Sequence, residues 1–386
     1  MAAIFAARPG VETLLLERTR DGGRKILISG GGRCNVLPAR VDERRFVTAS
    51  SAAALRNMLR SWPLSEQIAF FEEELRIALV EEPETEKLFP VSNRARDVRD
   101  GILALAARRG TEFLPDTKVT GLAPEGSGWR IEREGASALR VDRVIVATGG
   151  LSVPKTGSDG TGLALLRELG HTVHPTYPAL TPLLAEPAPF GVLAGVSLRV
   201  AITARSPEES AIATGGFLFT HHGYSGPAVL DVSHVAVRSR TAKVTVRWSD
   251  LGRKEWEAAL CADGARSVAS AVRAELPDRL AMMLLVSLAL DPATPLAQLR
   301  RVHRSRLIDA LTAGELPWTG DEGYKKAEVT GGGIALAEVD PRTMESRRHS
   351  GLFICGEVLD AFGPIGGYNF LWAWATGRAA GLGAGS

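Results

Sequence analysis

The chain has 386 residues, of which 45% are hydrophobic and 23% are charged. This length allows two or three domains with a sizeable core, and the composition is that of an ordinary soluble globular protein. The 46 basic and 44 acidic residues give a net charge of +2, and no basic run is interleaved with aromatic residues, so no nucleic acid is expected as a partner.

Cysteine usage and the apolar stretches exclude further classes. Cys34, Cys261 and Cys355 form no CxxC pair, so neither a disulfide framework nor a zinc site is expected. No apolar stretch reaches the ~18–20 residues of a membrane span, and the first residues lack the basic region and cleavage site of a signal peptide. We therefore expect no metal, no membrane contact and a cytoplasmic location, whereas the oligomeric state stays open.

The first elements are typical of a dinucleotide-binding βαβ unit. Residues 1–8 predict the end of a helix, and residues 11–17 predict a buried strand that ends in Glu17. An acid at the end of the second strand of such a unit binds the adenosine ribose hydroxyls, so Glu17 is a candidate ribose ligand. The first strand and its G-x-G-x-x-G loop, expected about twenty residues earlier, are absent from this sequence.

That absence is the main departure from the pattern. The first strand of such a sheet is central and buried on both faces, and its loss leaves unpaired backbone groups on its neighbours. Two explanations stay open: the true start codon lies upstream, or the protein is degenerate. The undamaged downstream motifs favour an upstream start codon.

The stretch from Gly23 to Val36 reads GRKILISGGGRCNV. Three consecutive glycines can bring bare backbone N–H groups close to a ligand, and Arg33 is suited to phosphate or carboxylate. A glycine-rich surface turn is the plain alternative. For Cys34 no base or resolving partner can be identified, so a small buried residue is expected there rather than a catalytic thiol. Lys25 either reaches the site or is an exposed lysine.

The remaining elements alternate without repeats. Residues 46–110 predict mainly helices, with a turn or loop at 87–93. Strands are predicted at 117–122, 128–133 and 139–147, followed by a helix that begins near Thr161 and by an antiparallel sheet or barrel over 183–246. The last predicted elements are helices over 253–316, strands within 325–340 and 351–356, and a helix over 368–383. The simplest architecture is one α/β domain from residues 1–180 and 326–386. Residues 181–325 then form an insertion that is β-barrel-like over about 181–250 and helical over about 253–316.

Five segments carry a family resemblance: GRKILISGGGRCNV, VIVATGGLSVPKTGSDGTG, GFLFTHHGYSGPAVLDVS, AEVTGGGIAL and GLFICGEVLDAFGPIGGYNF. In this order they resemble the BaiN-like (YhiN, aminoacetone-oxidase-type) FAD-binding flavoproteins over nearly the whole chain. The resemblance implies a glutathione-reductase-type FAD-binding (Rossmann-like) domain, an inserted β-barrel-like domain and a small helical domain.

The resemblance also implies an FAD-dependent oxidoreductase. Such an enzyme transfers hydride or electrons between a small organic substrate and the flavin, with NAD(P)H or oxygen as the second reactant. A degenerate remnant that no longer binds FAD is the alternative. No acid or base is assigned, because the cofactor carries hydride chemistry.

The resemblance places site residues along the chain. Ser29–Asn35 lie near the pyrophosphate and isoalloxazine, and Val119 pairs with the adenine through its main chain. The segment around Gly356 and Asp360 resembles one whose acid holds ribityl hydroxyls, and the last helix can stabilise the pyrimidine edge of a reduced flavin. The expected cofactor-binding residues are Glu17, Ser29, Gly30, Gly31, Gly32, Arg33, Cys34, Asn35, Val119, Thr148, Gly149, Gly356, Glu357, Asp360, Gly366, Gly367, Tyr368 and Asn369.

The substrate candidates are His221, Tyr224 and Tyr368. Adjacent residues on a strand point to opposite faces, so His221 and His222 are not expected to share a metal, and one of them is expected to face the flavin cleft. Trp372 and Trp374 are expected in the core.

Overall fold

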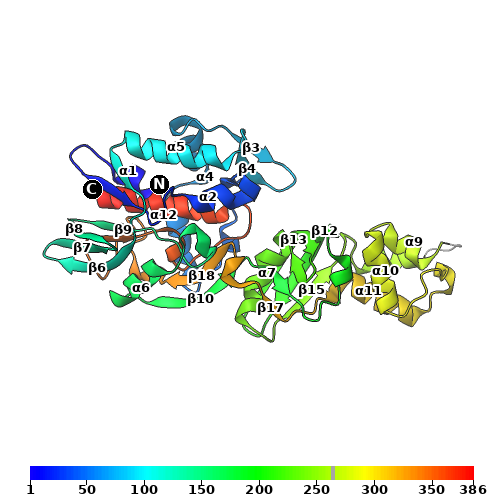
Figure 1. Ribbon diagram of the computed structural model, residues 1–386. Coiled ribbons are helices and arrows are strands. Elements are labelled where there is room, and N and C mark those ends of the chain that lie inside the picture. The colour runs from blue at the N-terminus through cyan, green and yellow to red at the C-terminus, as the bar shows by residue number, and fades with distance from the viewer. Residues whose placement is uncertain (262–265) are drawn as a thin grey trace. The chain divides into compact units, whose positions relative to one another are not determined.

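The computed structural model describes residues 1–261 and 266–386 and divides the chain into two compact units (Figure 1). Unit 1 consists of Met1–Pro178 and Glu328–Ser386. Unit 2 is Ala179–Ala327. Unit 1 is therefore assembled from two remote pieces of the chain, and unit 2 is inserted between them.

Parallel strands of unit 1 form two separate pairs. Strand β1 (Thr13–Leu16) pairs with β5 (Thr111–Leu114), and β19 (Leu352–Ile354) pairs with β9 (Val144–Val146). Within the described residues β1 and β19 share no ladder.

Helices make up much of unit 1 (Figure 1). They are α1 (Ala2–Ala6), α2 (Arg24–Ile28), α3 (Ala52–Arg60), α4 (Leu64–Ala69), α5 (Ala95–Arg108), α6 (Thr161–Glu168) and α12 (Tyr368–Gly385). Helix α1 packs along α12, where a Cβ at Gly381 would lie 2.3 Å from the Ala2 carbonyl oxygen. Trp372 and Trp374 of α12 are buried in the core, as expected.

Two small antiparallel sheets and one strand pair complete unit 1. The first sheet contains β6 (Val119–Glu125), β7 (Gly128–Arg133) and β8 (Ala136–Val141). The second contains β2 (Leu37–Pro38), β4 (Lys87–Pro90) and β3 (Leu79–Glu82). The strand pair is β10 (Val173–Ala179) with β18 (Val329–Ile334). The turn or loop expected at 87–93 is wrong for Lys87–Pro90. That segment is a strand because it pairs on both sides, with β2 and β3, and buries Leu88 and Phe89.

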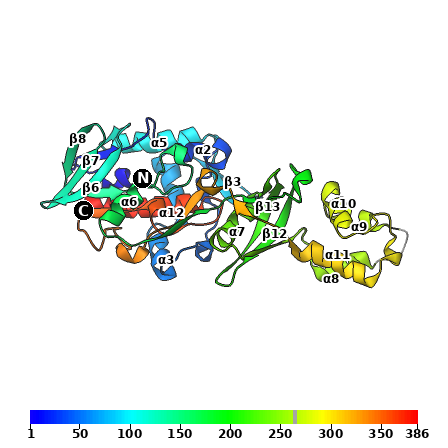
Figure 2. The same cartoon turned by 60° about the horizontal axis from the view of Figure 1, so that its bottom comes forward.

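A seven-stranded antiparallel sheet is the centre of unit 2. Its order is β16 (Gly314–Glu315), β15 (Lys243–Arg247), β12 (Ser197–Arg205), β13 (Ser210–Phe219), β14 (Gly223–Ser225), β11 (Leu183–Leu184) and β17 (Gly320–Asp321). Helix α7 (Pro227–Arg238) packs against β12 and β13 (Figure 2). The expectation of strands alone over 183–246 is wrong for α7. Its β-branched valines favour a strand, but Val229, Val232 and Val235 are buried at helical spacing behind a proline at the first turn.

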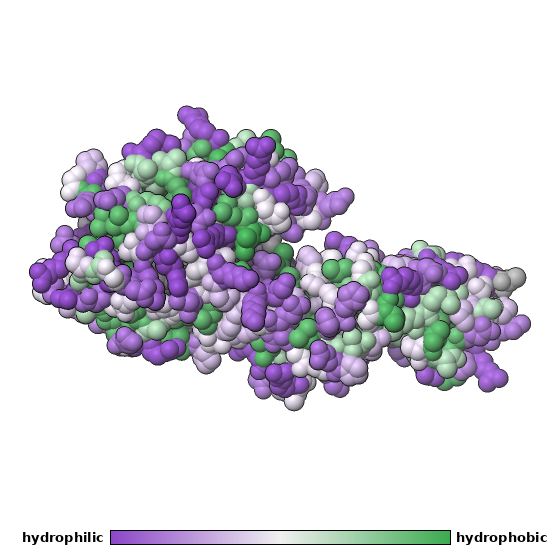
Figure 3. Space-filling model, in the orientation of Figure 1, coloured by the Kyte–Doolittle hydropathy of each residue, from purple (hydrophilic) through white to green (hydrophobic). Residues whose placement is uncertain are grey.

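The second part of unit 2 is helical, as expected. It contains α8 (Arg253–Leu260), α9 (Val268–Arg273), α10 (Asp278–Ser287) and α11 (Arg301–Ala313), which pack around Trp256, Leu280 and Leu307. Hydrophilic and hydrophobic residues are mixed over the visible surface (Figure 3). In the described part of the chain, none of the helices combines the length and the apolar character needed to cross a bilayer.

Glu338 joins the remote segment 171–172 to its own part of unit 1, where it also contacts Arg348. Its Oε2 lies 2.8 Å from His171 Nδ1 and accepts from the Thr172 N–H at 3.0 Å, while its Oε1 accepts from Arg348 at 2.9 Å. Burial alone would raise the pKa of this carboxyl, but the hydrogen bonds from Arg348, Thr172 and His171 outweigh burial and lower the pKa to about 2. The folded protein therefore holds Glu338 ionised.

We expect Glu338→Gln to lower the free energy of unfolding at neutral pH by about 1–3 kcal/mol. A folded pKa below the ordinary value stabilises the protein above the ordinary carboxyl pKa, and this stability is lost as the pH falls toward 2. Urea unfolding at neutral and acidic pH measures both effects, and the variant should lose stability less steeply in acid. Glu84→Gln in an exposed turn is the control, and equal behaviour of the two variants would contradict the assignment.

Candidate functional site

Two glycine-containing turns meet at the start of α12. With its amide oriented so that both groups are satisfied, Asn35 accepts from the Gly367 N–H at 2.9 Å and donates to the Leu37 carbonyl at 3.3 Å. Asn369 closes the second turn, because its Oδ1 accepts from the Gly363 N–H and its Nδ2 donates to the Gly363 carbonyl, each at 2.9 Å. The structure thus brings the GGGRCN and GGYN segments together.

Glycine is required where these turns touch. Gly30 has φ of +55°, and a Cβ there would lie 3.0 Å from the Asn35 nitrogen. Gly367 has φ of +90°, and its Cβ would lie 2.4 Å from the Leu37 carbonyl carbon. By contrast, a Cβ at Gly31 would meet nothing within 4 Å. The backbone at Gly31 is therefore open to an approaching ligand.

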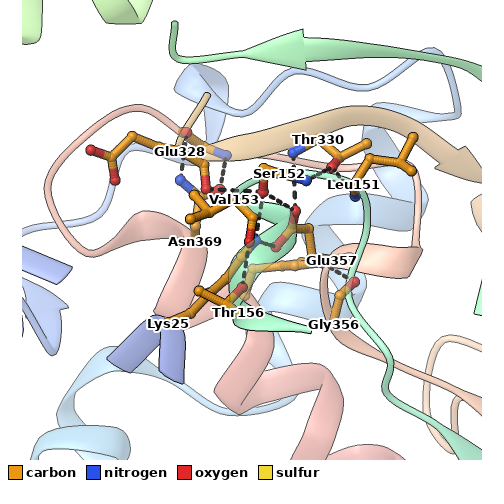
Figure 4. Close-up of polar contacts among 12 residues, drawn as sticks. Lys25, Leu151, Ser152, Val153, Thr156, Glu328, Thr330, Gly356, Glu357 and Asn369 are labelled. Carbon is orange, nitrogen blue, oxygen red and sulfur yellow. Dashed lines mark hydrogen bonds and ion pairs between the residues drawn. The ribbon is translucent and has the colours of Figure 1, made fainter. Parts of the chain in front are cut away.

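A charged network lies in the same unit (Figure 4). Lys25 Nζ on α2 is 2.5 Å from Glu357 Oε2 and 2.5 Å from Ser152 Oγ. The other oxygen of Glu357 accepts from Ser152 Oγ at 2.8 Å and from the Thr330 N–H at 3.0 Å. The Lys25 and Glu357 side chains are only 27% and 18% exposed, so this pair is more shielded from water than a surface ion pair.

Each member of the network comes from a different element. Lys25 lies on α2, Ser152 follows β9, Thr330 lies on β18, and Glu357 lies in the 3₁₀ turn Gly356–Val358 after β19. Ser152 and Thr330 are buried. Neither hydroxyl is among the residues predicted from the sequence, although Ser152 stands two residues after the double glycine of VIVATGG and Thr330 stands just before the glycines of VTGGG. A hydroxyl beside such glycines is the signal that could have found them.

The Thr148–Gly150 segment packs tightly rather than facing open space. A Cβ at Gly162 on α6 would lie 1.9 Å from Thr148 Oγ1, and one at Gly150 would lie 2.3 Å from Thr330 Oγ1. Gly149 has φ of +72° and lies against Ser158. This segment holds α6 and β18 against the end of β9.

Asp360 is an internal anchor. Its Oδ2 accepts from Ser50 Oγ at 2.8 Å, from the Ser50 N–H at 2.9 Å, and from the Ala49 N–H and Thr48 Oγ1 at 3.0 Å. The side chain is buried. Of the two acids expected in the segment after β19, Glu357 is therefore better placed than Asp360 to meet a ligand.

We expect Asp360→Asn to lower the free energy of unfolding by about 2–4 kcal/mol, because four donors lose a charged acceptor in a buried place. Denaturant unfolding checks this result. The exposed Asp142→Asn is the control and should change stability by less than about 0.5 kcal/mol. A loss no larger than that of the control would show that Asp360 is not an anchor.

Residues of the first loop have varied surroundings. Glu17, just after β1, accepts from the Thr19 N–H and hydroxyl at 2.7 Å through Oε1. Arg33, expected at a phosphate or the flavin edge, lies 3.0 Å from Glu82 and stacks over the Phe89 ring, so its charge is used within the protein. Cys34 is buried, as expected, and burial raises the pKa of its thiol to about 11. Its thiol is therefore protonated and unreactive at neutral pH.

Two further expected residues of unit 1 have structural contacts. Val119 begins β6 and pairs with Arg133, and the ladder shifts after it. The Tyr368 hydroxyl donates to the Arg40 carbonyl at 3.2 Å and accepts from the Asp42 N–H at 3.3 Å. Tyr368 is buried, so its hydroxyl is occupied by the backbone of the 40–42 segment.

His221 and Tyr224 belong to unit 2, whereas the network belongs to unit 1. The expectation that His221 and His222 lie on a strand is wrong. They form the bend between β13 and β14, and both are exposed. Tyr224 is buried among Phe190, Phe217 and Phe219, and burial raises the pKa of its hydroxyl. Among the described residues that hydroxyl has no hydrogen-bond partner.

Within residues 1–261 and 266–386, no group of three or more His, Cys, Asp or Glu side chains could hold a metal ion. The polar groups of unit 1 that could meet a ligand are instead the carboxylate paired with Lys25, the Glu17 carboxylate after β1, and the N-terminus of α12. This set of groups suits an organic ligand with hydroxyls and an electron-rich ring.

Comparisons with known proteins identify the family. Residues 1–383 match the family described as the HI0933-like protein Rossmann domain. The 3-dehydro-bile acid delta(4,6)-reductase of Clostridium scindens is 31% identical, over 99% of this chain and 95% of its own length. The ribosomal RNA dihydrouridine synthases of Escherichia coli and Haemophilus influenzae are 31% and 28% identical, each over 97% of this chain and over 92% and 93% of their own lengths.

A solved structure has the same fold. The 3-ketosteroid-delta4-(5alpha)-dehydrogenase of Rhodococcus jostii RHA1, solved in complex with 4-androstene-3,17-dione, aligns over 100% of this chain and 94% of its own, with a TM-score of 0.50 and 13% identity. The expected fold class, a Rossmann-like α/β FAD-binding fold, is confirmed, and so is the BaiN-like resemblance. The chain belongs to the HI0933-like Rossmann-domain family.

Proposed function

We propose that this protein binds FAD in unit 1 and reduces a carbon–carbon double bond that is conjugated with a carbonyl group. The observation that carries the proposal is the meeting of the GGGRCN and GGYN turns at the start of α12, in the unit that holds the Lys25–Glu357 pair. The names of the relatives support the reaction class. A bile acid delta(4,6)-reductase and a dihydrouridine synthase both add two hydrogens across such a bond.

The residues of unit 1 fit FAD at several points. Glu17 uses only Oε1 in the contacts of the described residues, which leaves Oε2 for ribose hydroxyls. The first N–H groups of α12 have no partner within the helix, and the helix dipole favours negative charge there, as on the pyrimidine edge of a flavin. Glu357 is the candidate for ribityl hydroxyls, and Gly31 leaves open backbone. When bound, FAD supplies the hydride chemistry.

Lys25 has a supporting role in this arrangement. Its ammonium group neutralises Glu357, which would otherwise place a negative charge beside an electron-rich cofactor. Ser152 fixes the geometry, because its hydroxyl contacts both Lys25 and Glu357. We assign these three side chains to holding and orienting the cofactor.

Flavin binding and turnover test the proposal. Purified protein is mixed with FAD, and quenching of flavin fluorescence and the visible absorption of the retained cofactor are measured. NADH and NADPH are then added without oxygen, and bleaching of the flavin identifies the electron donor. We expect a conjugated dienone steroid, or a uracil base within RNA, to restore the oxidised spectrum. The saturated analogue of each compound is the control.

Protein that stays colourless with excess FAD would overturn the proposal and favour the non-catalytic alternative. Reoxidation by oxygen alone, with every conjugated acceptor inert, would favour an oxidase instead. Reoxidation by the dienone but not by RNA would assign a small organic substrate, and the reverse result would assign an RNA substrate.

A further inference from the structure

The open face of the unit 2 sheet carries a cluster of cations. Burial alternates along β12 and β13: Val200, Ile202 and Phe217 are buried on the face that packs against α7, and their neighbours lie on the opposite face. The outward positions include four basic residues: Arg199 and Arg205 on β12, and Lys243 and Arg247 on β15. We call these four residues the basic face.

Strand register places the four cations in two pairs. Arg205 lies directly opposite Lys243. Arg247 lies opposite Ala201 and is therefore the diagonal neighbour of Arg199 on the same side of the sheet. Ala201 and Arg205 are four positions apart, so the two pairs lie about 13 Å apart along the strand. Like charges placed opposite each other destabilise a sheet.

Within the described part of the chain, none of the four side chains has an ion pair or a hydrogen bond. Two nearby acids are engaged elsewhere: Glu209 pairs with Arg238, and Glu208 contacts Ser206. Glu315 on β16 lies opposite Thr245 on the same face, diagonal to Lys243 and Arg247, but among the described residues it forms no ion pair with either. Four cations and one carboxylate thus share this face, which keeps a net positive charge that an external anion would neutralise.

The space between the two cation pairs offers hydroxyls and exposed apolar surface. Thr203 lies opposite both Thr245 and Ile212, and Ile212 is 71% exposed. Threonine hydroxyls donate to phosphate oxygens, while arginine and lysine supply the charge. The basic face therefore combines positive charge with hydroxyl donors, and both kinds of group contact phosphate backbones.

We propose that the basic face binds the phosphate backbone of RNA. A sheet face with two separated cation pairs suits a partner whose negative charges repeat along a chain. Two of the relatives are named as ribosomal RNA dihydrouridine synthases, which favours RNA over other polyanions. The net charge of +2, from which no nucleic-acid partner is expected, is a sum over the whole chain and does not describe the charge of this face.

The test compares two fourfold variants of the full chain. The first is Arg199→Gln, Arg205→Gln, Lys243→Gln and Arg247→Gln. The matched control replaces four exposed arginines of unit 1 that have no side-chain partner in the described part of the chain: Arg56→Gln, Arg96→Gln, Arg108→Gln and Arg342→Gln. Both variants lose four positive charges, so any difference between them reports on position. Circular dichroism confirms that both are folded.

The probe is a fluorescent mixed-sequence RNA hairpin, titrated with protein at several salt concentrations. We expect the basic-face variant to bind the hairpin at least about tenfold more weakly than the parent. The slope of log K against log salt concentration should become shallower by about 3, which corresponds to four lost phosphate contacts. The control should bind like the parent. A parent protein that does not bind the hairpin, or equal losses in both variants, would overturn the proposal. Stronger binding to phosphatidylserine vesicles or to polyglutamate than to RNA would also overturn it.

The use of this RNA as a substrate rests on the proposed reductase function, but the binding test does not. Binding is measured without FAD, and a steroid dienone assay measures the reductase function without RNA. Loss of RNA binding with intact dienone reduction assigns the defect to the basic face alone. Dienone reduction by a parent that binds no RNA would remove this inference and leave the proposed function standing.

Discussion

Replacement of Gly367 by alanine is expected to lower the free energy of unfolding by about 3 kcal/mol or more and to abolish retention of flavin. Its φ of +90° strains any residue with a Cβ, and that Cβ would lie 2.4 Å from the Leu37 carbonyl carbon and 2.7 Å from the Pro38 nitrogen. Both contacts are backbone atoms, which cannot rotate away. The Asn35–Gly367 hydrogen bond and the start of α12 must shift together.

Gly170 offers a matched control for this variant. Its φ of +88° is nearly the same, but an added Cβ would meet nothing within 4 Å. Gly170→Ala should therefore cost only about 1–2 kcal/mol of backbone strain and should keep flavin. Urea unfolding and the absorbance of bound flavin measure both results. Equal behaviour of the two variants would show that the contact between the turns is not what the site needs.

The second large effect concerns the Lys25–Glu357 pair. We expect Lys25→Met and Glu357→Gln each to lower the free energy of unfolding by about 1–3 kcal/mol, because each leaves a poorly hydrated partner without its counter-charge. The double variant should be less destabilised than the sum of the two, with a coupling energy of about 1–3 kcal/mol. A double-mutant cycle in urea measures this coupling, and FAD titration of the same four proteins measures the cofactor affinity.

An exposed ion pair provides the comparison. Lys118 and Glu134 lie 2.7 Å apart, but their side chains are 39% and 62% exposed. The same cycle with Lys118→Met and Glu134→Gln should give a coupling energy below about 1 kcal/mol and no change in FAD affinity. A coupling in the Lys25–Glu357 cycle as small as that of the exposed pair would contradict the role of the network. Unchanged FAD affinity in Glu357→Gln would remove Glu357 from the proposed ribityl contact.

Local physical chemistry made much of the fold predictable. The helices at 94–109 and 368–383 and the strand after Gly10 follow from hydrophobic periodicity and from breaker residues, which act over a few neighbours. The glycines of GGGRCN and GGYN predict turns for the same reason, since the tolerance of a positive φ is a property of glycine itself. Cys34 as a small buried residue also followed from its own neighbourhood in the sequence.

The secondary-structure predictions are wrong where contacts with segments distant in sequence determine the structure. Lys87–Pro90 became a strand because β2 and β3 pair with it, and the valines of α7 became helical because one side of that helix packs on the sheet. Neither fact is visible within a short window, since strand pairing and burial against another element outweigh local preference. The histidines at 221 and 222 were misjudged for a similar reason, because the turn between β13 and β14 is set by the pairing of those strands.

By itself, the sequence determined the family, the Rossmann-like fold class and the segments that approach the site, because these depend on ordered motifs and on local backbone preferences. Only the tertiary structure decided which of their side chains are available. It joined Lys25 to Glu357 across 332 residues, used the Asp360 carboxylate to hold residues 48–50, and placed Arg205 opposite Lys243 on an exposed face. Such pairings depend on distances between remote segments, which become defined only when the chain has packed.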